Sequence, residues 1–379
     1  MPDNKKHHFV PRFYLKLFSE NRKSINIFNL SSRKLIKNGC LKDQCYQDYF
    51  YGKDNKTEKD LSDIENEVSV FIKDIIRNDK LPPFMSGECL SLLLYIIIQR
   101  TRTTYSVDEF NELNDKLIKN IMKPTIEDMK LSKEEVDSVK ITVKNAQQIL
   151  LGLGIQHHPL LLDLKWKLLK AAPPFEFITS DNPVVFYNQI MNFRNFGSNT
   201  GFSAKGLQIF FPISPLHLII LYDDKVYGVG SQKQKEILVD KKNDIDQLNN
   251  LQYVSAYENI YFYSIKFEAL KGFFNAEKFR NHEKTSLKTL FKSENDETTN
   301  EFIVTSKNDI RTNLELSFIR ILKPAKEWRR IFQKQKAQPM AVARNENLLN
   351  DHKEFLKLVE SKKYTASEFF EYLNEKQNG

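Results

Sequence analysis

The chain has 379 residues, of which 41% are hydrophobic and 12% aromatic. This composition excludes an intrinsically disordered protein, because it can bury enough apolar surface to offset chain entropy, and the length predicts one large domain with an appendage, or two domains. The net charge of +8 is small for this length, so it permits contact with nucleic acid but does not require it. A mixed, solvated surface explains the same surplus.

The cysteine pattern and the apolar runs indicate the cellular compartment. Cys40, Cys45 and Cys89 form no CxxC pair, which favours neither a disulfide framework nor a structural zinc site and fits a reducing cytoplasm. The N-terminus has no long apolar segment with a cleavage site, and the apolar run 90–98 is too short to span a bilayer. We therefore expect a cytoplasmic protein without a membrane partner.

The first third of the chain predicts a short helix, a hairpin and two long helices. Residues 8–18, HFVPRFYLKLF, have apolar residues at helical spacing after a proline, and residues 24–39 alternate as in a β-hairpin. Residues 57–75 have one apolar face, which predicts a helix that ends before Pro82 and Pro83. A second helix is expected over residues 86–105, and its nearly all-apolar part places it at the centre of the domain.

The middle of the chain changes from helical to strand patterns. A charged helical region over residues 106–151 is expected to be interrupted at Pro124 and near Ser132, where SKEE resembles a capping box. A further helix is expected from His157 through Trp166 to Pro173. The strands that follow are expected within residues 175–186, 207–223 and 259–264, with a helix at about 245–256 before the last.

This order predicts an α+β fold, with central helices packed on a mostly antiparallel sheet and an additional C-terminal module. We expect residues 1–280 to form an α+β core domain that carries the HFVPR and TSDNP motifs. Residues 281–379 are expected to form a mainly helical, basic C-terminal extension, because residues 323–344 carry seven basic residues and a single acidic one.

The N-terminal motif is the clearest candidate for chemistry. His8, Pro11 and Arg12 place an imidazole and a guanidinium near the start of a helix. Histidine can transfer a proton near neutral pH and arginine can stabilise negative charge, so this corner could hold a phosphate or a carboxylate. The alternative is structural, with His8 packing locally and Arg12 paired with an acid. The residues alone leave both interpretations open.

A polar turn, Ser180 to Pro183, separates two strand-like segments. Asp181 could ligate a metal or orient His8, although Asp, Asn and Pro are also the ordinary residues of turns. Gln99 and Arg102 follow the apolar part of the second helix, and Glu65 lies beside the apolar face of the first. Buried polar groups need partners, so these residues could converge on a site, but each alone is more often part of a structural ion pair.

Several known classes of site lack their motifs in the sequence. There is no GxGxxG, GxxxxGK[ST], GxSxG or HExxH, which counts against dinucleotide-binding and P-loop folds, serine hydrolases and zincins. His157 and His158 have no third ligand at metal spacing. No cofactor is therefore assigned, and a divalent metal held by Asp181 and Glu65 stays an open option.

Taken in order, these motifs resemble the bacterial family called domain of unknown function 4238. They are HHFVPRFYLKLF, a hairpin that ends in an aromatic-Tyr-Gly segment, a helical Glu, QRTRT, a Trp separated by eleven residues from ITSDNPVV, FFPISP, and an Asn-x-Gln helix before Tyr-x-Tyr-Ser. The resemblance covers about residues 5–265. The order of the motifs makes it more specific than any one of them.

The chain departs from the family pattern in two places. His7 stands where Gln is typical, before His8 in the His position, and Thr104 stands where the family has the proline of Arg-Thr-Pro after Arg102. The matches in the last helix are Asn250, Gln252 and Ala256. The resemblance implies a shared pocket without an established activity, and members resemble accessory genes of mobile or phage-defence neighbourhoods.

The leading hypothesis is a nucleic-acid-directed hydrolase of a bacterial defence or toxin system, with RNA or DNA as its partner. His8 would be a general acid or base, and Arg12 and Arg102 would bind phosphate. Asp181, with Glu65, would orient the histidine or hold a metal. The expected substrate-binding residues are Gln99, Ser180, Asn182, Asn250, Arg329 and Arg330.

Three alternatives stay open. Residues 323–344, with Trp328 and Phe332, could grip a nucleic-acid backbone and stack on bases, or form a solvated amphipathic helix. The whole protein could be a non-catalytic sensor that binds a partner, such as the product of a neighbouring gene, and uses the polar cluster for structure. Transfer chemistry on a small phosphorylated metabolite would suit the same arginines.

Overall fold

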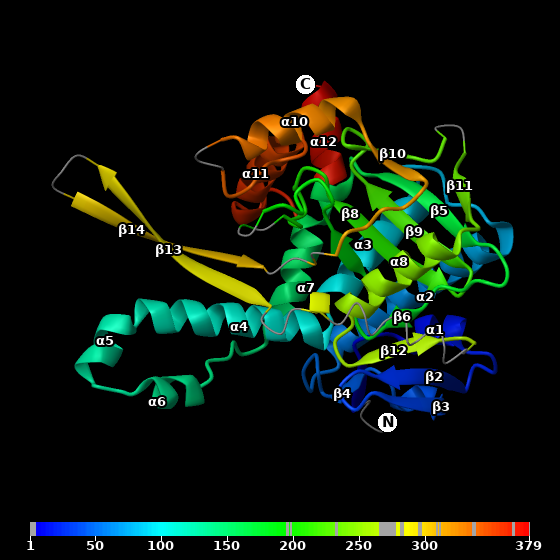
Figure 1. Ribbon diagram of the computed structural model, residues 1–379, viewed down its shortest axis with the longest axis horizontal. Coiled ribbons are helices and arrows are strands. Elements are labelled where there is room, and N and C mark those ends of the chain that lie inside the picture. The colour runs from blue at the N-terminus through cyan, green and yellow to red at the C-terminus, as the bar shows by residue number, and fades with distance from the viewer. Residues whose placement is uncertain are drawn as a thin grey trace.

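The computed structural model describes residues 5–194, 197, 199–231, 234–264, 278–280, 284–294, 298–307, 310, 312–335, 339–365 and 368–378. Within these ranges the fold is mixed α+β, as predicted, with mostly antiparallel sheets. Figure 1 shows two sheets on the right, helices packed around them, and an arm that extends to the left. No helix in the described ranges is long and apolar enough to cross a membrane.

The N-terminal part places the His-Pro-Arg motif between a strand and a short helix. Its elements are β1 (Lys6–His8), α1 (Arg12–Leu15), η1 (Lys16–Phe18), β2 (Ser24–Asn29), β3 (Lys34–Cys40), η2 (Leu41–Asp43) and β4 (Tyr46–Asp48). β1 pairs antiparallel with β4, which sets His8 opposite Tyr46. β2 and β3 form the predicted hairpin, and α1 begins directly after Pro11, as the fixed backbone angle of proline favours.

Two long helices follow. They are α2 (Lys56–Asn78) and α3 (Gly87–Thr101). The hydroxyl of Ser86 caps α3 by accepting a hydrogen bond from the backbone of Cys89. The predicted helix 86–105 is divided, because Thr103 caps a new helix, α4 (Thr104–Ile121), through the backbone N–H of Ser106. Arg102 therefore lies at the junction of two helices.

The central sheet has five strands in the order β11-β5-β9-β8-β7. These strands are β5 (Lys165–Ala171), β7 (Val185–Tyr187), β8 (Gln208–Ser214), β9 (His217–Tyr222) and β11 (Glu236–Val239). Only the pairing of β11 with β5 is parallel. Every residue of β8 and β9 is buried, which is expected when both faces of a sheet are covered.

Helices cover the two faces of this sheet. Ile209 and Phe211 pack in the core cluster of α2 and α3, whereas Phe210 between them packs with Leu248 and Phe332. The latter two belong to α8 (Lys242–Ser255) and α10 (Lys323–Gln333). The alternation follows from the two-residue period of a strand.

The helix predicted from His157 to Pro173 is wrong. Only η3 (His158–Leu161) is helical there, and β5 runs from Lys165 to Ala171. β5 pairs with β9 over six residues and with β11 on its other edge, so pairing to distant segments decides its conformation.

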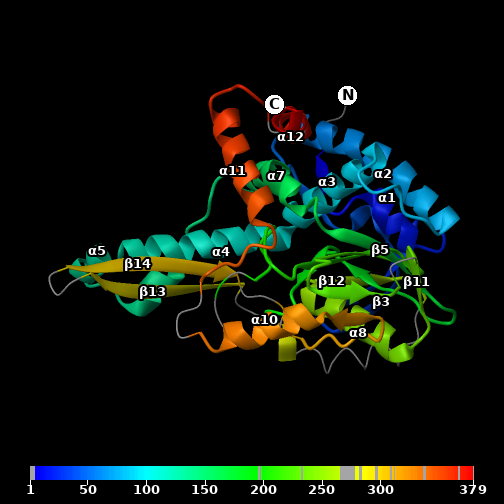
Figure 2. The same ribbon diagram turned by 90° about the horizontal axis from the view of Figure 1, so that it is seen from above.

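A second sheet of four strands has the order β3-β2-β12-β6, with β6 (Thr179–Ser180) and β12 (Asn259–Phe262). The arm in Figures 1 and 2 joins α4 to a hairpin of β13 (Thr285–Glu294) and β14 (Thr298–Lys307). The predicted interruptions are confirmed, because α5 (Lys123–Asp128) begins beside Pro124 and the capping box opens α6 (Lys133–Ser138). α7 (Ala146–His157) leads back to the core.

The segment after residue 280 packs on the core. β15 (Ile319–Ile321) pairs with β10 (Tyr227–Val229), and α10, α11 (Glu346–Glu360) and α12 (Phe369–Asn378) follow. Arg344 forms a salt bridge of 2.7 Å with Asp163 and donates to the backbone oxygen of Leu160. The extension therefore begins with a β-hairpin and is tied to the core by a strand pair and a buried ion pair.

Candidate functional site

An open polar pocket, the His8 pocket, lies between the N-terminal motif and α2, and its volume is about 570 Å³. The lining residues are Lys5, Lys6, His8, Arg12, Phe13, Lys42, Asp43, Glu58, Ser62 and Glu65. The three residues from α2 are spaced by four and three positions, which puts them on one face of the helix. The pocket therefore unites three predicted site residues, His8, Arg12 and Glu65.

His8 is held neutral in this pocket. Burial lowers its pKa from the ordinary value of 6.5, and the positive charges of Arg12 and Lys6 lower it further. Its Nε2 lies 3.2 Å from the backbone oxygen of Lys42. A carbonyl oxygen only accepts hydrogen bonds, so Nε2 carries the proton and Nδ1 is the basic nitrogen.

The cations of the pocket differ in their partners. Lys5 is paired with Asp48 and Lys6 with Asp43, each at 2.8 Å. Arg12 and Lys42 are exposed, and neither forms an ion pair with a carboxylate of the residues that the structure describes. Two basic groups are thus available to an anion beside a neutral imidazole.

Glu58 was not predicted as a site residue. Burial raises its pKa above the ordinary value and the negative charge of the nearby Glu65 raises it further, whereas the positive Arg102 acts in the opposite direction. A carboxyl group that tends toward the protonated form can donate a proton, so Glu58 supplies an acid in the pocket that contains the basic His8. Its spacing of seven residues from Glu65 on a predicted helix is the sequence signal that could have found it.

Arg102 lies beneath the pocket and is completely buried. Its Nη1 donates to Glu65 at 2.7 Å, and its Nε and Nη2 donate to Oε1 of Gln99 at 3.1 and 2.8 Å. Burial alone would lower the pKa of Arg102, but the carboxylate of Glu65 raises it above its ordinary value. The guanidinium of Arg102 has no exposed surface, so the structure gives the predicted role in phosphate binding no support.

Gln99 extends this buried network to the N-terminal motif. Its Nε2 donates to the backbone oxygen of Phe9 at 3.0 Å, and its side chain is fully buried. The structure therefore gives the predicted contact of Gln99 with substrate no support. The Gln99–Arg102–Glu65 network instead holds α3, α2 and the segment after His8 together, and it leaves Glu65 at the pocket wall with 22% of its side chain exposed.

Asp181 belongs to a separate buried network. Its carboxylate accepts three backbone hydrogen bonds, from Tyr257 at 2.8 Å, Glu258 at 2.6 Å and Asn259 at 2.9 Å. Burial raises the pKa of Asp181 to about 6, although these hydrogen bonds act in the opposite direction. The carboxylate thus fixes the turn from α8 into β12. Both carboxylate oxygens accept from these backbone groups, so the structure gives the predicted orientation of His8 by Asp181 no support.

Ser180 and Asn182, the neighbours of Asp181, also form hydrogen bonds at the turn from α8 into β12. Nδ2 of Asn182 donates to the backbone oxygen of Ser255 at 2.9 Å, and Gln252 donates to the hydroxyl of Ser180 at 2.5 Å. Ser180 and Asn182 are both buried. Their polar groups bind the end of α8, so the structure gives their predicted contact with substrate no support.

The remaining predicted residues lie elsewhere. Asn250 is half-buried on α8, and its buried Oδ1 has no hydrogen-bond partner within the described chain. Arg329 and Arg330 lie on α10, where Arg329 stacks on Phe193 and the exposed Arg330 pairs with Glu327 at 2.6 Å. None of the three lines the His8 pocket.

The aromatic residues of the basic segment pack inward. Trp328 and Phe332 stack on each other with ring centroids 4.8 Å apart, and Phe332 is buried in the core. Phe332 is therefore not available to a nucleic-acid base, and the prediction that it stacks on one is wrong. The solvated amphipathic helix is the better description of α10.

The two carboxylates that the sequence offered as metal ligands, Glu65 and Asp181, have other partners in the structure. Among the residues that the structure describes, no group of three or more His, Cys, Asp or Glu side chains could hold a metal ion. Glu65 is bound to Arg102, and Asp181 to backbone N–H groups. The two carboxylates therefore do not form the metal site that the sequence left open.

A known protein family matches most of the chain. Residues 6–266 match the family described as "Protein of unknown function (DUF4238)". The chain belongs to the DUF4238 family. Neither the curated proteins nor the solved structures contain a match. The match confirms the resemblance seen in the motifs, and it spans the His8 pocket and the Asp181 network but ends before β13.

His7 stands where the resemblance to the family leads us to expect Gln, and its contacts suit either residue. It is fully buried, its Nε2 lies 2.9 Å from Oδ1 of Asn55, and its Nδ1 accepts from the backbone of Tyr51 at 3.1 Å. One nitrogen donates and the other accepts, as the two ends of a glutamine amide would. His7 is thus a structural substitute, and His8 is the histidine that reaches the pocket.

Proposed function

We propose that this DUF4238 protein is a nucleic-acid-directed hydrolase, a nuclease-like phosphodiesterase, with the His8 pocket as its active site. The observation that carries the proposal is that a neutral histidine opens onto one polar pocket with Arg12 and Lys42, two cations that form no ion pair with a carboxylate in the described part of the chain. Perturbed titratable groups in an open cavity are typical of catalytic sites. Phosphate is the anion that suits two basic groups beside a general base.

The geometry supports a general acid–base step. Nδ1 of His8 accepts the proton of an attacking hydroxyl, from water or from a ribose, while its oxygen bonds to phosphorus. Arg12 and Lys42 hold the phosphate oxygens and stabilise their negative charge. The bond from phosphorus to the leaving oxygen breaks, and Glu58 donates the proton that this oxygen takes up. Glu65 and Arg102 act as positioning residues, because they fix α2 against the motif.

The exposed Arg330 and the partly exposed Arg329 add a second contact to the proposal. They lie on α10, away from the pocket, where they would hold the backbone of a longer strand. Substitution of both by alanine is then expected to weaken binding of long strands with little sequence preference, and to leave cleavage of a dinucleotide unchanged.

The test is cleavage of end-labelled single-stranded and double-stranded RNA and DNA by the purified full chain. His8→Asn keeps the size and polarity of the side chain but removes the base, so it should lower the cleavage rate about 100-fold or more. Arg12→Ala should raise KM and lower kcat together. Arg77→Ala is the matched control, because Arg77 is an exposed arginine of α2 outside the pocket.

The cellular setting that we propose is a bacterial phage-defence or toxin system. Its support is the resemblance of the family to accessory genes of such neighbourhoods. Expression of the wild-type chain in a phage-sensitive host should reduce plaque formation or host growth, and His8→Asn at equal abundance should not. Equal effects of the two chains would contradict a role for the pocket.

A second candidate is a non-catalytic sensor or partner-binding protein. The burial of Arg102, Gln99 and Asp181 favours it, because three of the predicted polar residues serve packing. In that case His8→Asn would leave a folded protein whose phenotype changes only with its abundance. The cleavage assay with its stability control separates the two functions.

A further inference from the structure

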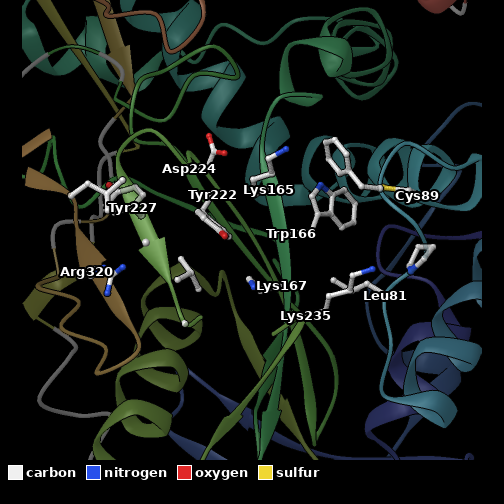
Figure 3. A pocket seen from close by; sticks show the side chains of 16 residues that line it. Leu81, Cys89, Lys165, Trp166, Lys167, Tyr222, Asp224, Tyr227, Lys235 and Arg320 are labelled. Carbon is white, nitrogen blue, oxygen red and sulfur yellow. The ribbon is translucent and has the colours of Figure 1, made fainter. Parts of the chain in front are cut away.

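A second cavity, the Trp166 pocket, is lined in part by the loop between α2 and α3 and has a volume of about 460 Å³. Figure 3 shows it between a wall with Leu81 and Trp166 and a wall with Tyr227 and Arg320, with Tyr222 and Lys167 between them. It shares no lining residue with the His8 pocket. Its size falls in the ordinary range of small-molecule sites.

One side of the Trp166 pocket is aromatic. Trp166 is half-buried on β5, Tyr222 ends β9, and Phe84 lies in the loop before α3 with 47% of its surface exposed. The ammonium of Lys165 lies 4.4 Å from the centre of the Phe84 ring. Aromatic side chains around an open cavity provide flat surfaces for a planar ring.

The pocket also gathers positive charge. Lys165, Lys235 and Arg320 are exposed and Lys167 is buried, whereas Asp224 is the one acidic residue of the lining. None of the four cations forms an ion pair with a carboxylate in the described part of the chain. A strand pair brings Arg320 here from the C-terminal extension, because β15 lies beside β10.

Lys167 is the most informative of these cations. Its side chain emerges from the centre of the sheet, is 6% exposed, and donates to the backbone oxygens of Ser231 and Gln234. An ammonium has three donors, so these two neutral acceptors leave one donor and the full charge without a counter-ion. Burial accordingly lowers the pKa of Lys167. An anion in the pocket would compensate this charge.

We propose that the Trp166 pocket binds a free nucleotide, with the base against Trp166 and Phe84 and the phosphate between Lys167 and Arg320. The wall opposite the aromatics contains Gly228, where a Cβ atom would lie 2.9 Å from Nε of Arg320. The glycine thus allows the arginine to lie across β10 and to face the cavity. A single nucleotide suits a cavity with walls on two sides better than a continuous strand does.

The test uses the full chain and three probes at equal ionic strength, namely adenosine monophosphate, adenosine and inorganic phosphate. Titration calorimetry should give binding of the nucleotide about tenfold or more tighter than of either part alone. Trp328→Phe leaves Trp166 as the one remaining tryptophan, and its fluorescence should then be quenched at saturation. A short oligonucleotide should bind more weakly than the mononucleotide.

Variants locate the site. Arg320→Ala changes an exposed residue and should weaken nucleotide binding about tenfold, and Lys167→Met should do the same. Thermal denaturation checks that Lys167→Met stays folded, because the substitution removes a buried charge and also two hydrogen bonds to backbone oxygens. Lys225→Ala is the control, because Lys225 is exposed on the neighbouring turn and does not line the pocket. Absence of saturable binding, equal affinity for phosphate alone, tighter binding of the oligonucleotide, or unchanged affinity of the Arg320→Ala variant would each overturn the proposal. None of these results depends on cleavage at His8.

Discussion

Arg102 and Glu65 form a salt bridge of 2.7 Å in which the arginine is completely buried and the glutamate keeps 22% of its side chain exposed at the His8 pocket. The pair therefore connects a buried charge to the wall of the candidate site. Because Gln99 binds the same guanidinium and the backbone of Phe9, the position of the His-Pro-Arg motif depends on this buried charge.

The salt bridge leads to the first prediction. Glu65→Ala leaves Arg102 buried without its partner, so the free energy of unfolding in urea should fall by about 3–5 kcal/mol. Asp63→Ala, an exposed carboxylate two residues away on α2, should change it by less than about 0.5 kcal/mol. The double variant Glu65→Leu, Arg102→Met should recover part of the loss, and a double variant less stable than Glu65→Ala would contradict this account.

His8 should titrate below the ordinary histidine value. Its pKa is lowered by burial and by the charge of Arg12, so its NMR titration midpoint should lie below 6.5, and Arg12→Ala should raise it. The unfolded chain then binds the proton first as the pH falls, and the stability that neutral His8 provides is lost below about pH 6.5. A midpoint at or above 6.5, or one that Arg12→Ala leaves unmoved, would show that His8 is not held neutral.

Asp181 should contribute to the stability of the fold and not to catalysis. Asp181→Asn loses acceptors for the backbone of residues 257–259, so the free energy of unfolding should fall by about 1–3 kcal/mol. The folded-state pKa of about 6 lies above the ordinary 3.8, so this carboxyl stabilises the fold most at low pH and less as the pH rises through 6. The difference between the two chains should therefore be larger at pH 5 than at pH 7.

The cleavage rate of the Asp181→Asn variant provides the control for its loss of stability. The rate per folded molecule of Asp181→Asn should equal that of the wild type. A variant with full stability and no cleavage would instead assign Asp181 to the active site, as the sequence first suggested.

His7 should tolerate the residue that is typical of its family. His7→Gln keeps a donor for Asn55 and an acceptor for the N–H of Tyr51, so its free energy of unfolding should stay within about 1 kcal/mol of the wild type. His7→Leu leaves both partners unsatisfied in the core and should cost about 1–3 kcal/mol. Equal stabilities of the two variants would show that the hydrogen bonds of His7 are unimportant.

The sequence could predict the elements whose own residues determine them. The apolar face of α2, the capping box of α6 and the hairpin of β2 and β3 are local patterns, and the structure contains all of them. β5 could not be predicted, because its partners β9 and β11 come about fifty to seventy residues later in the chain. Pairing between distant segments leaves little trace in a local window.

For the candidate site, too, the sequence could predict what nearby residues determine but not what depends on distant segments. His8 and Arg12 are four residues apart at the start of a helix, so the sequence could indicate that they share a pocket. Whether a polar residue faces solvent depends on the whole fold. The sequence indicated phosphate binding for Arg102, and orientation of His8 or metal binding for Asp181, because their structural partners, Glu65 and the backbone after α8, lie 37 and about 76 residues away. Glu58 lay on the predicted helix seven residues before Glu65, and only this helical spacing connected it to the site.

Chemical rescue tests the central claim, that His8 is the base of a phosphodiester-cleaving pocket. His8→Gly leaves space for a small base, so cleavage by this variant should be lost in buffer and partly restored by added imidazole, in proportion to its neutral form. Arg12→Ala should not respond to imidazole, since it keeps His8. A His8→Gly chain that is folded and cleaves as the wild type does, or that imidazole fails to rescue, would contradict the account.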